Sequence, residues 1–123
     1  KINMNYIKMC IQVAETEEFT HLIIIYNGSF TSSVKKIVEI SDNLEIELIN
    51  ENRLKYNITK HSLVPKHTLV TDKSELLELY KLKLSNIPVI LKTDPIVEWY
   101  NWKPGNIVRI DRHDNSTAYR IIK

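Results

Sequence analysis

Cysteine and glycine are the residues that this sequence contains least of. Cys10 is the only cysteine among 123 residues, so no disulfide can form within the chain. Its neighbours Met9 and Ile11 favour a small buried apolar side chain over a reactive thiol. Gly28 and Gly105 are the only glycines, which excludes the glycine-rich loops that cradle phosphates, including the P-loop and the dinucleotide fingerprint.

The common motifs of metal and nuclease sites are absent as well. The sequence has no H-E-x-x-H, no C-x-x-C and no E-x-K or D-x-K triplet. Four histidines, at positions 21, 61, 67 and 113, are candidate metal ligands, but no neighbouring cysteine or carboxylate pair completes a set. We therefore predict no catalytic residues, no metal and no cofactor. A pairing of Cys10 with a histidine is neither supported nor ruled out by the sequence.

Long apolar runs and a strong charge of one sign are also missing. No run approaches the roughly 20 residues that span a bilayer, and no secretory leader precedes the first apolar segment. We predict a nuclear or cytoplasmic protein that is not secreted and has no membrane partner. Residues 1–60 carry seven basic against eight acidic residues, and residues 61–123 carry ten against seven. An excess this small predicts at most an auxiliary contact with DNA.

The apolar patterning predicts a chain that mixes helices and strands, in the α/β or α+β class. The predicted strands are Tyr6 to Ala14, His21 to Tyr26, Leu44 to Ile49, Leu54 to Ile58, Ile107 to Asp111 and Thr117 to Ile122. The first two should pair antiparallel across a polar turn, and the last two should form a hairpin.

Helix starts are predicted at three places. The hydroxyl cluster Thr31, Ser32 and Ser33 precedes apolar residues at 34, 37 and 38, as in a capped helix. Its free N–H groups, with Lys35 and Lys36 nearby, suit a phosphate, and they equally suit an ordinary surface helix.

The other two helix starts depend on an aspartate. Asp72 and Glu75 have capping-box spacing, and Asp94 precedes a proline at the first helical position, Pro95. The sequence Lys103-Pro104-Gly105 should end the last helix.

The most constrained stretch is His61-Ser62-Leu63-Val64-Pro65-Lys66-His67. Pro65 fixes its own φ and pushes Val64 into the extended region, so the stretch should be a stiff extended run. A proline in a strand belongs at a sheet edge, where another chain can lie alongside. A linker strand with two surface histidines is the alternative.

The residues from this stretch onward resemble a known family, which comprises the fifth-largest subunit shared by eukaryotic RNA polymerases and its archaeal counterpart. The resemblance rests on residues that occur in the family's order over the second half of the chain. These are Asn57-Ile58-Thr59, His61, Leu63 to His67, Glu75-Leu76-Leu77, Tyr80, Ile87-Pro88, Ile90, Asp94-Pro95, Gly105, Val108, Ile110, Arg112 and Tyr119-Arg120. The first half matches more loosely, through Tyr6 to Val13, Leu22 to Tyr26 and Thr31 to Val38.

The resemblance implies a non-catalytic, hetero-oligomeric polymerase subunit with residues 1–57 as the end of a jaw domain and 58–123 as an assembly domain. The assembly domain would dock on the largest subunit, and the jaw would lie near downstream DNA. The implied partner-binding residues are His61, Leu63, Val64, Pro65, Lys66, His67, Pro88, Asp94, Pro95, Tyr119 and Arg120. The implied DNA-proximal residues are Thr31, Ser32, Ser33, Lys35 and Lys36.

Two departures from the family pattern accompany the resemblance. Ser32 stands where eukaryotic members have proline, and the loop between Arg112 and Tyr119 is shorter and lacks a glycine. These changes suggest a divergent homologue, with a viral polymerase as one source, and the start at Lys1 suggests a missing N-terminal part. Two other hypotheses stay open: a small nuclease-like enzyme of nucleic acids, and a free-standing binding module.

Overall fold

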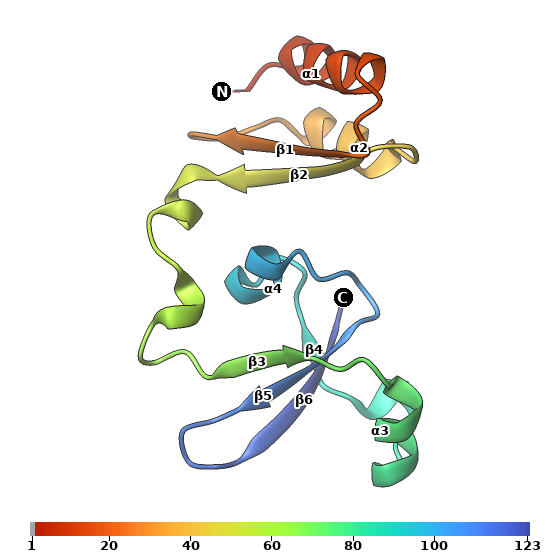
Figure 1. Cartoon of the computed structure of the whole chain (residues 1–123), viewed down its shortest axis with the longest axis vertical. Coiled ribbons are helices and arrows are strands. Elements are labelled where there is room, and N and C mark those ends of the chain that lie inside the picture. Colours follow the sequence, from red (N-terminus) through yellow and green to blue (C-terminus); the bar gives the residue numbers. More distant parts are fainter. Residues whose placement is uncertain (1) are drawn as a thin grey trace. The chain divides into compact units, whose positions relative to one another are not determined.

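The computed structural model describes residues 2–123 and divides the chain into two compact units, one ending at Tyr56 and the other spanning Asn57–Lys123 (Figure 1). Each unit has its own sheet, and each is described by itself. Helices and strands occur in both, which confirms the predicted α+β class. Among the described residues, no helix has the length and apolar character needed to cross a membrane.

The first unit is a two-stranded sheet with two helices on one face (Figure 1). Its elements are helix α1 (Met4–Thr16), strand β1 (His21–Tyr26), helix α2 (Ser32–Ile40), strand β2 (Glu45–Asn50) and the 3-10 turn η1 (Glu51–Leu54). Ile7 of α1, Ile24 of β1 and Val34 of α2 form the buried centre. Cys10 packs against this cluster as a half-buried thiol.

Residues 6–14 form part of helix α1, so the strand predicted there is wrong. Ile7 and Ala14 are buried, and Cys10 and Ile11 complete the same helical face. Tyr6, Met9 and Val13 are apolar but exposed on the opposite side. Because both faces carry apolar residues, the segment has the pattern of a buried strand. The helix is nevertheless capped at its start, where the Asn5 amide donates to the Asn3 side chain.

Strand β1 pairs in parallel with β2, with His21 opposite Glu45 and Tyr26 opposite Asn50. The predicted antiparallel pair of residues 6–14 with 21–26 is therefore also wrong. Parallel strands need a crossover connection, and α2 supplies it, so this part is a β-α-β unit. The strand predicted at Leu44 to Ile49 is confirmed, with bounds shifted by one residue.

The second unit is a four-stranded mixed sheet in the order β3-β5-β6-β4. Its elements are η2 (Ile58–Lys60), β3 (Lys66–Leu69), α3 (Lys73–Tyr80), η3 (Leu84–Asn86), β4 (Val89–Ile90), α4 (Pro95–Tyr100), β5 (Ile107–Asp111) and β6 (Thr117–Ile122). The predicted hairpin is confirmed as β5 and β6.

Helices α3 and α4 cover opposite faces of this sheet (Figure 1). Val97 of α4 packs with Val108, Ile110 and Ile122 on one face. Leu76 of α3 packs with Ile107 and Ile87 on the other. Because successive residues of β5 point to opposite faces and both faces are covered by a helix, both kinds of position must be apolar. The adjacent residues Ile107 and Val108 are accordingly both fully buried.

The three helix starts were predicted correctly, although α2 lacks the hydroxyl cap that was predicted for it, and two other predictions were wrong. Asp72 accepts from the Glu75 amide at 2.9 Å, and Asp94 accepts from the Ile96 amide at 2.9 Å. Helix α4 ends at Tyr100, because the left-handed backbone of its C-cap residue, Asn101 (φ 52°), stops it before Gly105. Residues 54–58 do not form the predicted strand, since they span the end of η1, a bend and the start of η2.

Candidate partner-binding surface

The stretch His61–His67 begins as a turn and becomes a strand, so the predicted extended run is correct only for its second half. The Val64 amide bonds to the His61 carbonyl at 3.0 Å, and the Leu63 amide donates to His61 Nδ1 at 3.2 Å. This turn leaves the Leu63 side chain 81% exposed. Pro65 then leads into β3. The turn presents Leu63, a large apolar side chain with nothing of its own unit to cover it.

Strand β3 lies at the edge of its sheet, as predicted from Pro65. The Val70 amide bonds to the Ile107 carbonyl of β5 at 2.9 Å. Because hydrogen-bonded residues alternate in an antiparallel ladder, the backbone groups of His67 and Leu69 face the free edge. The His67 ring is fixed by a 2.8 Å bond between Nδ1 and the Pro65 carbonyl. The edge strand is thus short, and the outward backbone groups of His67 and Leu69 have no partner strand within the second unit.

Of the remaining predicted partner residues, Tyr119 shares a sheet face with Lys66 of this edge strand, and the others lie elsewhere on the unit. Pro88 is exposed, and its carbonyl accepts from the Ile121 amide at 2.8 Å. Tyr119 and Arg120 point to opposite faces of β6, since Tyr119 pairs with exposed Arg109 and Arg120 with buried Val108. Asp94 and Pro95 are half-buried and start α4. The Asp94 side chain caps its own helix, because it accepts from the Ile96 amide.

The residues predicted to lie near DNA are all exposed at the start of α2. They are Thr31, Ser32, Ser33, Lys35 and Lys36. Thr31 occupies the N-cap position, but its side chain makes no capping bond. Lys35 Nζ lies 6.0 Å from the centre of the Phe30 ring, which itself packs edge-to-face on Tyr26. A cation–π contact of this length leaves the ammonium group accessible.

Within residues 2–123, no group of three or more His, Cys, Asp or Glu side chains is placed to hold a metal ion. In the first unit His21 pairs with Glu47, and in the second unit the His67 ring bonds to the carbonyl of Pro65, just before its own strand.

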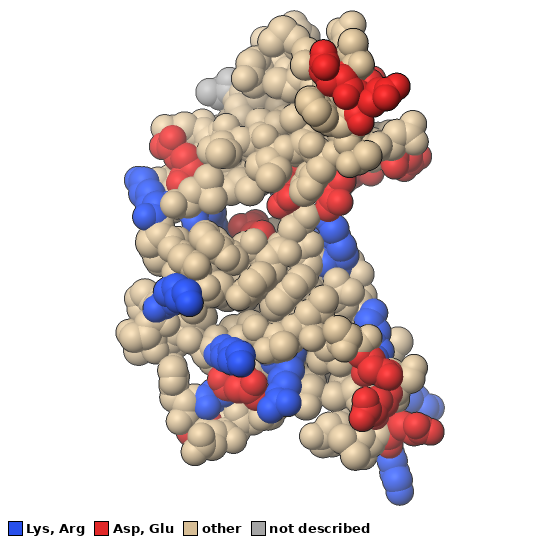
Figure 2. All heavy atoms as spheres, viewed as in Figure 1, with Lys and Arg blue, Asp and Glu red and all other residues tan. Residues whose placement is uncertain are grey.

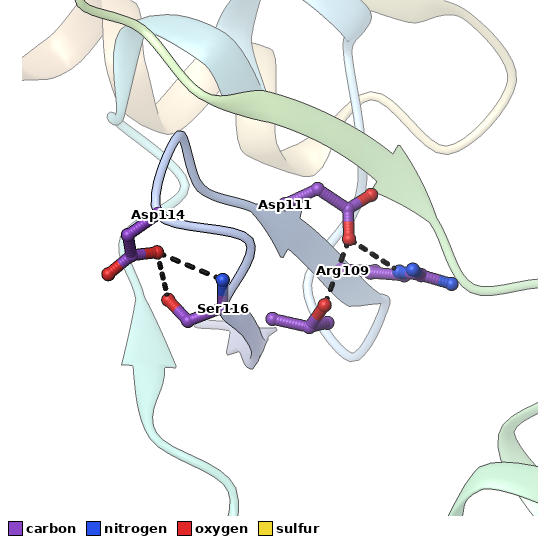
Figure 3. A network of polar contacts seen from close by, with 5 residues as sticks. Arg109, Asp111, Asp114 and Ser116 are labelled. Atoms are coloured by element: carbon purple, nitrogen blue, oxygen red, sulfur yellow. Dashed lines mark hydrogen bonds and ion pairs between the residues drawn. The ribbon is translucent and has the colours of Figure 1, made fainter.

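A polar network on the β5–β6 hairpin was missed by sequence reasoning (Figure 3). Arg109 Nε donates to Asp111 Oδ1 at 2.8 Å, and Thr117 Oγ1 donates to the same oxygen at 3.1 Å. In the loop that follows, the Ser116 amide and hydroxyl both donate to Asp114, at 2.9 and 2.6 Å. The alternation of Arg109 and Asp111 with buried neighbours was the available signal.

These contacts lower the pKa of both aspartates. The hydrogen bond from Arg109 is the largest cause for Asp111, and the hydroxyl of Ser116 is the largest for Asp114. Asp114 is exposed and the Asp111 side chain is 34% exposed, so solvent screens the effect at both groups. Tyr119, packed 5.7 Å from the Tyr80 ring, has its pKa raised, first by burial and then by its hydrogen bond with Tyr80.

The lowered aspartate pKa values predict acid sensitivity of the hairpin. A carboxyl whose folded pKa lies below its ordinary value of 3.8 stabilises the fold above that value and loses this contribution as the pH falls through the folded pKa. We expect hairpin amide protection to fall with pH below 3.8 in the natural chain and to fall less in Asp111→Asn. Hydrogen exchange followed by NMR measures this, and an identical pH profile for both proteins would contradict it.

Comparison with known proteins identifies the second unit. The family model described as RNA polymerase Rpb5, C-terminal domain, matches residues 56–122. The chain is 36% identical over 127 residues to the DNA-directed RNA polymerases I, II, and III subunit rpabc1 of Dictyostelium discoideum. It is 35% identical over 125 residues to the RPABC1 subunits of Caenorhabditis briggsae and Caenorhabditis elegans.

These matches cover 99% of this chain but only 64% of the Dictyostelium protein and 59% of the Caenorhabditis proteins. The chain thus spans about three-fifths of the length of the curated relatives it matches. The resemblance inferred from the ordered residues after Asn57 is confirmed by the family match. The chain belongs to the family of the C-terminal domain of RNA polymerase Rpb5.

Proposed function

We propose that the chain is a non-catalytic subunit of a multisubunit DNA-directed RNA polymerase. The observation that carries this proposal is the family match over residues 56–122. The similarity to a polymerase subunit, at 36% identity, extends over 99% of the chain. Residues 58–123 act as an assembly domain on the polymerase's largest subunit, and residues 1–57 form part of a jaw beside downstream DNA. The protein then works where its polymerase works, in the nucleus for a cellular enzyme or in the cytoplasm or virion for a viral one.

The geometry of the second unit supports an assembly role. The free edge of β3, with Leu63 and Pro65 before it, offers backbone groups and an exposed apolar side chain to a partner strand. The residues proposed to contact partner subunits are His61, Leu63, Val64, Pro65, Lys66 and His67 at the β3 edge, Pro88 before β4, Tyr119 and Arg120 on opposite faces of β6, and Asp94 and Pro95 at the start of α4.

The alternatives make different predictions about the chain alone. A nuclease-like enzyme would cleave DNA or RNA with a divalent metal, and a free-standing module would not sediment with a polymerase. In gradient sedimentation of lysate from the source cells, we expect the chain to migrate with a large complex that has RNA polymerase activity. Migration only as a monomer would contradict the proposed function.

We also propose that the start of α2 lies near downstream DNA in the assembled enzyme. Lys35→Glu combined with Lys36→Glu should weaken binding of downstream duplex DNA, and more so at low salt, because phosphate contacts are screened as ionic strength rises. The measurement is a salt titration of DNA affinity with polymerase containing each variant.

The matched control is Lys81→Glu with Lys83→Glu, which makes the same charge change at exposed residues of the second unit. A loss that does not depend on salt, or an equal loss in the control, would contradict a phosphate contact at Lys35 and Lys36.

A further inference from the structure

One face of the second unit's sheet is covered by α3 only in part. Cross-strand partners point to the same face, so the register places side chains in three rows. The row nearest α3 is apolar and packs against Leu76, with its central residue fully buried and the two outer ones half-buried, and the next two rows are open. The apolar row is Val70, Ile107 and Ile121, and the open rows are Thr68, Arg109 and Tyr119, followed by Lys66, Asp111 and Thr117.

The open rows carry two cations around one carboxylate. Asp111 lies between Lys66 and Thr117 in its row and accepts from Arg109 Nε at 2.8 Å. The Arg109 side chain is 50% exposed. Within the described residues its hydrogen bonding uses Nε alone, which leaves the two terminal amino groups for a second acid. Asp111 therefore orients Arg109 without occupying the part of the guanidinium that forms bidentate pairs.

An aromatic side chain borders these charges. The Tyr80 ring at the end of α3 lies 5.7 Å from the Tyr119 ring and is 51% exposed. It offers an apolar surface with a polar tip, as do aromatic residues at many protein interfaces. Lys66 also adjoins the exposed β3 edge, so this face continues into the partner surface proposed above.

We propose that this face, formed by Lys66, Thr68, Arg109, Tyr119 and Tyr80, binds an acidic polypeptide segment of a protein partner. Arg109 and Lys66 take carboxylates of the segment. Tyr80 lies beside Tyr119, on the side of Arg109 away from Lys66, and packs against the chain next to the carboxylate that Arg109 binds. The inference rests on the proposed function, because it states that a partner which binds the second unit contributes an acidic segment.

The charge pattern favours an acidic peptide over nucleic acid. Asp111 stands at the centre of the face, where it would oppose a regular run of phosphates. On the visible side of the second unit, basic and acidic side chains are interspersed and do not form a continuous basic stripe (Figure 2). A peptide can place its carboxylates to either side of Asp111, whereas a phosphate backbone carries a charge at every nucleotide.

The test titrates the full chain with a short glutamate-rich peptide and with the same peptide carrying glutamine instead. We expect only the glutamate peptide to bind, with NMR amide shifts concentrated on β3, β5 and β6. Arg109→Gln should weaken binding about two- to fivefold, whereas Lys60→Gln, an exposed lysine on η2, should leave it unchanged.

Asp111→Asn is the variant for which the proposal predicts tighter, not weaker, binding of the peptide. Asparagine keeps an Oδ1 acceptor for Arg109 and Thr117 but loses the negative charge, so the glutamate peptide should bind about two- to fivefold more tightly. Unchanged or weaker binding in a folded Asp111→Asn protein would overturn the proposal. So would equal losses in Arg109→Gln and Lys60→Gln, or tighter binding of a single-stranded oligonucleotide through the same residues.

This test fails separately from the proposed function. Peptide binding is measured on the isolated chain, and polymerase association is measured in lysate. A chain that sediments with polymerase but ignores the glutamate peptide would refute only the acidic-segment inference. A chain that binds the peptide but never sediments with polymerase would refute only the proposed function.

Discussion

Ile107→Ala is expected to lower the free energy of unfolding of the second unit by about 2–5 kcal/mol, because it removes buried apolar atoms and leaves a cavity. Ile107 is fully buried and packs with Leu76 and Ile87 beneath α3. Ile107 lies on β5, which is flanked by β3 and β6, so strands on both sides keep the cavity from collapsing. Urea denaturation followed by circular dichroism measures the change.

The matched control is Leu63→Ala, which removes a comparable apolar side chain that is 81% exposed. We expect this substitution to change stability by about 0.5 kcal/mol or less. Equal losses in the two variants would show that the core of the second unit is not centred on Ile107 as described.

Pro65→Gly combined with Lys66→Glu is expected to reduce incorporation of the chain into polymerase by roughly tenfold or more, the loss that follows removal of an energetically dominant interface residue. Glycine removes the fixed φ that stiffens the entry to β3, and glutamate reverses the charge at the edge strand. The measurement is the ratio of tagged chain to largest subunit after affinity purification, by quantitative mass spectrometry.

Folding should survive this double substitution. Losing a compatible proline costs about 0.4–1 kcal/mol, through the unfolded state. The new carboxylate of Glu at position 66 faces Asp111, which adds a modest cross-strand repulsion. Thermal melting checks that the variant is folded, and Lys60→Glu controls for charge alone. Unchanged incorporation would remove the His61–His67 stretch from the interface.

Local signals in the sequence predicted the second unit better than the first. The caps at Asp72 and Asp94 and the hairpin of β5 and β6 are each determined by residues within a few positions of one another. Edge placement of β3 followed from one proline. These features need no knowledge of the rest of the chain.

The errors lie where distant residues decide the outcome. Helix α1 has apolar side chains on both faces, and only packing of Ile7 against Ile24 and Val34 selects its buried side. The parallel pairing of β1 with β2 depends on α2 lying between them as a crossover. Sequence spacing could not reveal either contact.

The candidate site shows the same division. The sequence singled out Lys66 and Tyr119 through family resemblance but missed Arg109 and Asp111. The open rows exist only when β3, β5 and β6 align in one register, which brings Lys66 beside Asp111 and Arg109 beside Tyr119. The pairing of β3 with β5 joins Lys66 to Asp111, which lies more than forty positions later in the chain. The alternation of β5 alone indicates an outward face, without showing what lies next to it.

The most direct test of the central claim is affinity purification of the tagged chain from its own cells, followed by mass spectrometry of everything retained. We predict the large subunits of a DNA-directed RNA polymerase, with its largest subunit retained in equal copy number to this chain. A chain recovered as a monomer, or with partners that include no polymerase subunit, would contradict the assignment of this protein to a polymerase.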